Sequence, residues 1–250
     1  MRLIADVHGA TAALRRIAQA PGPLLILGDF INFIDYRTNE GIVTDVSGKD
    51  FTDKMVALRT AGEAVAAGAL WNEFRKGREE ELRAAYDKAI EAAYDDILAP
   101  LDGTEVYATY GNVDRPALLK ARLPESGRFV DGEVVEIEGL RVGFAGGGIV
   151  SINTPGEVSE GEMEAKLAAL GPVDMLCTHV PPAIPALQKD VIAGRAKGSG
   201  AVLAYLKEYQ PPFHYYGDVH QPQAFTWRVG ATVCRNVGYF RATGRATNHP

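Results

Sequence analysis

The sequence has few of the features that mark disulfide-rich, membrane-spanning or nucleic-acid-binding proteins. Its two cysteines, Cys177 and Cys234, each lie in an apolar run, so we expect buried free thiols and no disulfide framework. No apolar stretch approaches the length of a membrane span, and the N-terminal residues show no basic and apolar secretory leader. No block of Lys and Arg stands out against a net charge of −6, which argues against a nucleic-acid-binding surface. Together these absences favour a soluble, cytoplasmic protein.

What the sequence does contain is ordinary for a globular protein. Hydrophobic residues make up 46% and charged residues 23% of the chain, which is typical of a soluble fold. A chain of 250 residues can bury a substantial core. No repeats, low-complexity tracts or Pro/Ser-rich linkers divide it. We therefore predict a single domain over residues 1–250.

Residues 24–29 give the clearest strand signal. Four apolar residues run into Gly28 and Asp29, a pattern typical of a buried strand that brings a carboxylate to the end of a sheet. A strand at residues 3–5 and a helix at residues 12–20 precede it, which predicts a βαβ unit with two parallel neighbouring strands. Taken alone, Asp29 would more often be a helix cap or an ion-paired residue than a ligand.

A helical insertion is predicted at about residues 34–99, between two strands. Residues 39–50 are polar and contain glycine, which indicates a loop, and residues 52–74 are Ala-rich and predict a helix. Residues 79–98 give the clearest helix, with apolar side chains at helical spacing between charged ones. We interpret the insertion as outer-layer packing rather than as a lid.

The remaining chain alternates between strands and helices. Glu138-Gly139 predicts a two-residue hairpin turn. The three glycines at residues 146–148 indicate a bend or a close approach to a ligand, whereas a phosphate-cradling P-loop lacks its Lys and Ser/Thr here. The predicted strands are residues 105–110, 134–137, 140–144, 173–177, 213–216, 224–229 and 232–237, and the predicted helices are a short one from Arg115-Pro116 and residues 160–170 and 199–209.

Five predicted strands end in polar residues of the types that commonly bind metals. These are Asp6 and His8, Asp29, Asn112, His179, and Asp218 and His220. Neighbouring strand ends lie at one edge of a parallel sheet, so we expect these side chains to meet in one cleft. Imidazole, carboxylate and amide ligands suit Mn, Fe or Zn, and the lack of a thiolate argues against a structural zinc site. The pattern therefore predicts a binuclear metal centre, with His214 and His249 left out as core and surface residues.

The order and spacing of these residues resemble the five motifs of the calcineurin-like metallophosphoesterases. The matching motifs are Asp-x-His (Asp6, His8), Gly-Asp (Gly28, Asp29), Gly-Asn (Gly111, Asn112), a His followed by prolines (His179, Pro181, Pro182) and Gly-x-x-His (Gly217, His220). The resemblance runs from Arg2 to about Gly238, apart from the helical insertion. It implies an α/β fold, a four-layer α-β-β-α sandwich of two mixed sheets.

The resemblance also implies how the metals are held. Residues matching Asp6, His8 and His220 hold one divalent ion, and those matching Asn112, His179 and position 218 hold the other, with Asp29 bridging the two. Both ions are expected to be Mn, with Fe or Zn as alternatives. The family then hydrolyses phosphoesters by attack of a metal-bridging hydroxide.

Two residues depart from the family pattern. Val113 stands where the family often has a His that protonates the leaving group. Loss of such a general acid lowers the rate by about 10²–10⁴, so substrates with good leaving groups would be favoured. Asp114 could serve as a weak acid/base there or cap the following helix, and we favour the cap. Asp218 replaces a His ligand, so we expect weaker binding of the second metal.

Two functions follow from these motifs. The first is a metal-dependent phosphoesterase, a phosphodiesterase or phosphatase acting on a small phosphorylated substrate, with Arg37 and Arg115 as minor candidates for holding it. The alternative is a catalytically weak or silent scaffold of the same fold that binds a protein partner, which the changes at positions 113 and 218 would permit.

Overall fold

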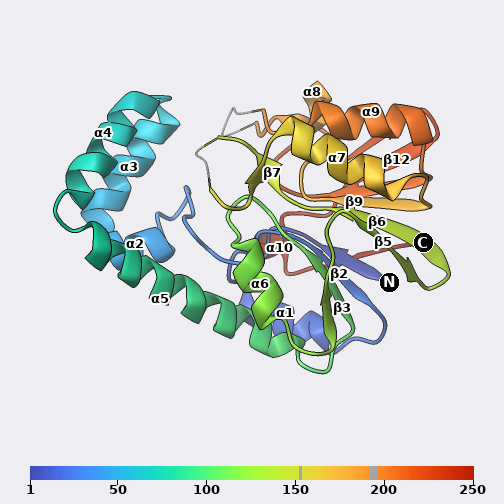
Figure 1. Ribbon diagram of the computed structural model, residues 1–250, viewed down its shortest axis with the longest axis horizontal. Helices are drawn as coiled ribbons and strands as arrows, with labels where there is room; N and C mark the ends of the chain where they lie inside the picture. Colours follow the sequence, from blue (N-terminus) through green and yellow to red (C-terminus); the bar gives the residue numbers. More distant parts are fainter. Residues whose placement is uncertain (152–153, 192–195) are drawn as a thin grey trace.

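The computed structural model describes residues 1–151, 154–191 and 196–250 of the chain. Two mixed β-sheets pack face to face, and helices cover their outer faces (Figure 1). The first sheet has five strands, in the order β13 (Thr247–Asn248), β1 (Arg2–Ile4), β2 (Leu24–Leu27), β3 (Val106–Thr109) and β4 (Gly127–Phe129). The second has six, in the order β11 (Thr226–Val229), β12 (Thr232–Asn236), β10 (Phe213–Tyr216), β9 (Met175–Thr178), β6 (Leu140–Ala145) and β5 (Glu133–Ile137).

The apolar residues of β2 belong to two hydrophobic cores, one between the two sheets and one between the first sheet and its helices. Leu25 and Leu27 face the second sheet, whereas Leu24 and Ile26 face the helices on the other side. Side chains alternate between the faces of a strand, so a strand buried on both sides must be apolar throughout. The βαβ prediction is confirmed, because β1 pairs parallel to β2 across α1 (Thr11–Ala18).

Helices form the two outer layers. α1, α5 (Glu79–Leu98) and α6 (Pro116–Arg122) cover the first sheet, and α7 (Glu160–Leu170) and α9 (Gly200–Tyr209) cover the second. Ser159 and Glu162 form a capping box at the start of α7, and the Ser199 hydroxyl accepts the Val202 N–H at the start of α9. The remaining short elements are the 3₁₀ turn Ala99–Leu101, β7 (Gly148–Ile149), β8 (Glu157–Val158), α8 (Pro185–Gln188) and α10 (Phe240–Thr243).

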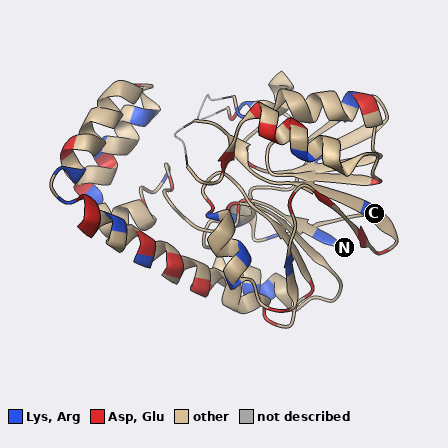
Figure 2. Ribbon diagram, in the orientation of Figure 1, with Lys and Arg blue, Asp and Glu red and all other residues tan. Residues whose placement is uncertain are grey.

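The insertion between β2 and β3 is helical, as predicted, but its first part differs. The expected loop at residues 39–50 contains α2 (Ile42–Ser47), and the expected helix at residues 52–74 is two helices, α3 (Lys49–Thr60) and α4 (Ala64–Arg75). Figure 1 shows α3 and α4 extending away from the sheets at the far end of α5. Charged residues of both signs mark the exposed face of α5 (Figure 2), while Ile90 and Tyr94 are buried against the sheet. This half of α5 is outer-layer packing, as we interpreted it.

Two other expectations are confirmed. Cys177 and Cys234 are buried and free. Within the described ranges, none of the helices is both long enough and apolar enough to cross a membrane.

Candidate metal centre

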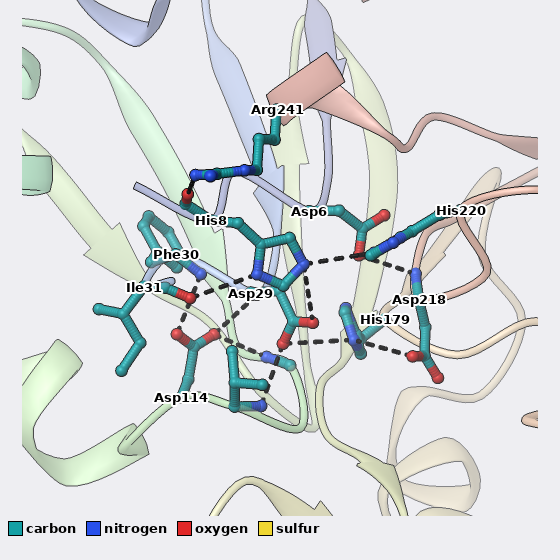
Figure 3. Close-up of polar contacts among 12 residues, drawn as sticks. Asp6, His8, Asp29, Phe30, Ile31, Asp114, His179, Asp218, His220 and Arg241 are labelled. Carbon is teal, nitrogen blue, oxygen red and sulfur yellow. Dashed lines mark hydrogen bonds and ion pairs between the residues drawn. The ribbon is translucent and has the colours of Figure 1, made fainter. Parts of the chain in front are cut away.

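The side chains predicted to bind metal follow five strands, and the structure gathers them at the carboxyl ends of those strands. They are Asp6 and His8 after β1, Asp29 after β2, Asn112 after β3, His179 after β9, and Asp218 and His220 after β10. Figure 3 shows all of them except Asn112. They do not come from one edge of a single parallel sheet, as we expected, because β1, β2 and β3 belong to the first sheet and β9 and β10 to the second. The cluster therefore lies where the two sheets meet.

Two overlapping groups of these side chains are close enough to hold a metal ion. One ligand atom from each of Asp6, His8 and His220 lies within 4.8 Å of the others, and the same is true of Asp6, Asp29 and His179. The Nε2 atoms of His8 and His220 lie 3.3 Å apart. Two nitrogens bound to one ion at about 2.1 Å would be separated by about 3.0–3.4 Å, so this spacing suits a shared ion.

The Asp29 carboxylate lies between the two histidines of different sheets. Its Oδ2 is 3.6 Å from His8 Nε2, and its Oδ1 is 3.6 Å from His179 Nε2 (Figure 3). The Val113 N–H donates to Oδ1 at 3.1 Å and fixes the carboxylate in this position. Asp29 can therefore contact an ion on either side of it.

Backbone carbonyls set the orientation of two imidazole rings. His179 Nδ1 lies 2.7 Å from the Leu27 carbonyl, and His8 Nδ1 lies 3.3 Å from the Ile31 carbonyl. A carbonyl only accepts, so each Nδ1 carries the proton and each Nε2 has a free lone pair directed into the cluster. This arrangement is typical of histidines that ligate metals.

Three polar atoms of the cluster are buried without a hydrogen-bond partner among the described residues: Asp6 Oδ2, Asn112 Oδ1 and His179 Nε2. Buried acceptors of this kind are costly unless something positive or hydrogen-bonding meets them. A divalent ion fits this donor set, because carboxylate, amide and imidazole atoms are its usual ligands. The buried Asp and His residues could thus hold a metal ion.

The backbone at the cluster is held in an uncommon conformation. Asp6, His8, Asp29 and Asp218 have φ values of 59°, 41°, 58° and 64°. A left-handed backbone costs a non-glycine residue about 1–2 kcal/mol, and such strain concentrates at functional sites. Gly111 permits the close approach of these segments, because a Cβ on it would collide with the Asp29 carboxylate and the His179 ring.

The charges of the cluster shift several pKa values. Burial opposes ionisation of Asp6, but the His220, His179 and His8 rings hold the pKa of its carboxyl below the usual range. Burial lowers the pKa of His8. For His179, burial is outweighed by the Asp29, Asp218 and Asp6 carboxylates, which raise its pKa. The carboxylates thus create a site that favours positive charge.

Asp114 does not cap the following helix, contrary to our interpretation. α6 begins at Pro116 without a side-chain cap. The Asp114 carboxylate instead accepts the backbone N–H groups of Asp29, Phe30 and Gly111 at 2.8, 3.0 and 2.9 Å. Burial and the neighbouring Asp29 raise its pKa to about 6. Asp114 is fully buried, and it ties the turn after β2 to the turn after β3.

Tyr94 extends this network into the helical layer. Its hydroxyl donates to Asp114 at 3.1 Å and accepts the Arg115 N–H at 2.7 Å. Tyr94 is buried on α5, so the helical insertion contacts the turn after β3, and Asp114 links that turn to the one that carries Asp29.

The sequence did not reveal Lys197, which contacts Asp218. Its Nζ lies 2.5 Å from Asp218 Oδ1 and 2.9 Å from the Asp218 carbonyl. Lys197, Asp218 and Asn112 line one pocket of about 450 Å³, together with Ile149 and Val150. The sequence feature that could have indicated a neighbouring cation is the carboxylate of Asp218 at a position where the family has a histidine.

The sequence analysis also assigned no role to Tyr239 and Arg241. The Tyr239 ring stacks on His220 at 3.9 Å between centroids and 8° between planes, and Arg37 lies over the Tyr239 ring at 5.2 Å. Arg241 donates to the His8 carbonyl at 2.6 Å (Figure 3). Arg115 lies over the Phe33 ring instead of facing the ligands. These contacts restrain two imidazoles from the C-terminal side of the chain.

His214 is fully buried and bonds Thr178 at 2.8 Å, whereas His249 is partly buried beside Tyr215. Gly148 approaches Asn112 so closely that a Cβ would collide with its side chain. The glycines at residues 146–148 therefore allow a close approach to a predicted ligand residue.

Comparison with known proteins shows the fold alone. No family model and no curated protein matches the chain. A solved crystal structure aligns with a TM-score of 0.59 and 14% identity, over 96% of this chain and 90% of its own. The protein TT1561 from Thermus thermophilus aligns with a TM-score of 0.54 and 12% identity, over 98% of this chain and 96% of its own. The molecule is thus an α/β protein of two packed mixed sheets that carries a buried Asp/His cluster.

Proposed function

We propose that the protein is a metal-dependent phosphoesterase of the calcineurin-like metallophosphoesterase type. One observation carries the proposal: the Asp29 carboxylate lies between His8 and His179, each with Nε2 directed inward. The order of ligands along the chain and the two packed mixed sheets agree with that family's four-layer sandwich. The substrate would be a small phosphodiester or phosphomonoester.

Four residues would hold one divalent ion: Asp6, His8, Asp29 and His220. Asn112, His179 and Asp218, with Asp29 shared, line a second position of the kind that holds another divalent ion in that family, and Mn is the favoured metal of the centre. When bound, such ions polarise a phosphoryl oxygen and lower the pKa of a coordinated water.

The chain's own residues would bind and orient the substrate. The pocket beside the cluster contains the Lys197 ammonium and the Asn112 side chain, which suit an anionic oxygen. Val113 offers no proton to a leaving group, and Asp114 is enclosed by its own donors. Good leaving groups, such as nitrophenolate, are therefore the expected substrates.

Hydrolysis of bis-p-nitrophenyl phosphate with added Mn²⁺ tests the proposal. We expect turnover that depends on Mn²⁺ and falls by at least about 100-fold in Asp29→Ala. Turnover equal to that of Asp29→Ala would refute the enzyme for this substrate class.

The alternative is a weak or silent scaffold of the same fold that binds a protein partner. The Lys197–Asp218 pair favours it, because an oxygen of a predicted ligand is already occupied. A scaffold would bind Mn²⁺ without hydrolysing either phosphodiesters or phosphomonoesters.

A further inference from the structure

We propose that Lys197 replaces the second metal ion, so that the centre holds one divalent ion and one ammonium. This inference rests on the metal centre of the proposed function and concerns how many ions that centre binds. It assigns the single ion to Asp6, His8, Asp29 and His220.

The contacts of Lys197 support this assignment. Its ammonium reaches both the Oδ1 and the carbonyl oxygen of Asp218. Asp218 Oδ1 is also the oxygen that faces His179 Nε2, at 3.9 Å. An ion bound between Asp218 and His179 would therefore have to displace the ammonium from its partner or lie directly beside it.

The charge of the centre supports it as well. Asp6, Asp29 and Asp218 are the buried carboxylates that face the ligand positions, whereas Asp114, buried as well, has its oxygens turned to four hydrogen-bond donors. One divalent ion and one ammonium balance the three negative charges that face the site, whereas two divalent ions with the ammonium would leave an excess of positive charge there.

Hydrogen bonds fix the backbone at Lys197 and at Ser199, two residues further on. The Lys197 N–H donates to the Gln188 carbonyl at 2.8 Å, and the Ser199 N–H donates to the Pro181 carbonyl at 2.9 Å. These bonds tie the residues before α9 to the segment that follows His179. The backbone of Lys197 therefore has a fixed position from which its side chain reaches Asp218.

The number of bound Mn²⁺ ions tests the proposal without reference to activity. Wild-type protein dialysed against excess Mn²⁺ should retain one ion per chain by elemental analysis, with the electron paramagnetic resonance spectrum of an isolated Mn²⁺. Lys197→Met should bind two ions and show a spin-coupled pair. Lys189→Met, an exposed lysine of the same segment, is the matched control and should behave as wild type.

Asp218→His gives an independent version of the test, since it removes the lysine's partner and supplies an imidazole. It too should bind two ions, and it carries the test if Lys197→Met does not fold. Two coupled ions in the wild type, or a single ion in both variants, would overturn the proposal. Failure to hydrolyse any phosphoester would overturn the proposed function instead and leave the ion count standing.

Discussion

The Asp29 carboxylate lies between His8 and His179, and therefore between the two proposed ion positions. Loss of an outer-shell partner costs about 10–100-fold in metal affinity, so loss of a shared ligand oxygen should cost at least about 100-fold. We therefore predict that Asp29→Asn weakens Mn²⁺ binding by that factor in a calorimetric titration, although Asp6, His8 and His220 are intact.

The same substitution can be tested in the Lys197→Met variant, which we expect to bind two ions. If Asp29 contacts both positions, adding Asp29→Asn there should weaken both ions together, and retention of one at full affinity would show that it does not bridge. Asp102→Asn removes an exposed carboxylate and is the control for charge.

Asp114 accepts four donors, three backbone N–H groups and the Tyr94 hydroxyl. In Asp114→Asn an amide group replaces one of the acceptor oxygens and leaves donors unpaired, at about 1–3 kcal/mol for each. We expect a loss of at least about 2 kcal/mol in the free energy of unfolding, measured by urea denaturation. Tyr94→Phe removes one of the four donors and leaves the Arg115 N–H without its acceptor, so it should cost about 1–2 kcal/mol; a loss larger than that of Asp114→Asn would contradict the network.

At the residue scale, the sequence predicted which side chains gather in the cluster but not the residues that support them. Five strands are followed by a recognisable polar residue, so Asp6, Asp29 and His179 could be found from local pattern. Lys197 and the partners of Asp114 could not, because their contacts join segments that are far apart in the chain and carry no periodic signal. A carboxylate near a helix start resembles a cap, which is why Asp114 was misinterpreted.

At the element scale, strongly periodic segments were predicted well. α5 and α7 have the bounds we expected. The short α2 was missed because six residues between Gly41 and Gly48 show too little periodicity. The break between α3 and α4 was also missed, where Gly62 adopts a φ of 78° within an Ala-rich run.

The α3–α4 pair has a small hydrophobic core, and we predict that its packing does not affect metal binding. Phe51 packs on Phe74 at 4.1 Å and Trp71 at 5.6 Å between ring centroids. Phe51→Ala should cost about 3–5 kcal/mol of packing there. We expect faster hydrogen exchange in α3 and α4 with Mn²⁺ affinity unchanged within a factor of about two. Weaker Mn²⁺ binding in this variant would mean that the pair supports the metal centre.

At the scale of the whole molecule, the proposed ligands come from both sheets, so metal binding should stabilise the whole fold. Mn²⁺ at about 100 times its Kd should add about 2.7 kcal/mol, which corresponds to roughly 5–10 °C in Tm for a chain of this size. Thermal scans with Mn²⁺ and with a chelator measure the shift. Mg²⁺ at equal concentration is the control for ionic strength, and an identical Tm under Mn²⁺ and chelator would argue against a metal held by both sheets.

The architecture could be anticipated only in part from local signals. Parallel pairing of β1 with β2 follows from the βαβ pattern, but the assignment of β9 and β10 to a separate sheet depends on long-range packing. The expectation that all ligands lie at one sheet edge failed for this reason.

The ligands proposed for the first ion lie far apart in the sequence, with His220 standing 212 positions after His8, and β1 pairs with β13 at Arg2 and Asn248. During synthesis, Asp6 and His8 leave the ribosome long before the residues that complete their site. Asp6, His8 and His220 can therefore meet only after residue 220 has been synthesised. The ion proposed for these three residues would bind late, and a chain truncated before residue 220 would keep only the group of Asp6, Asp29 and His179.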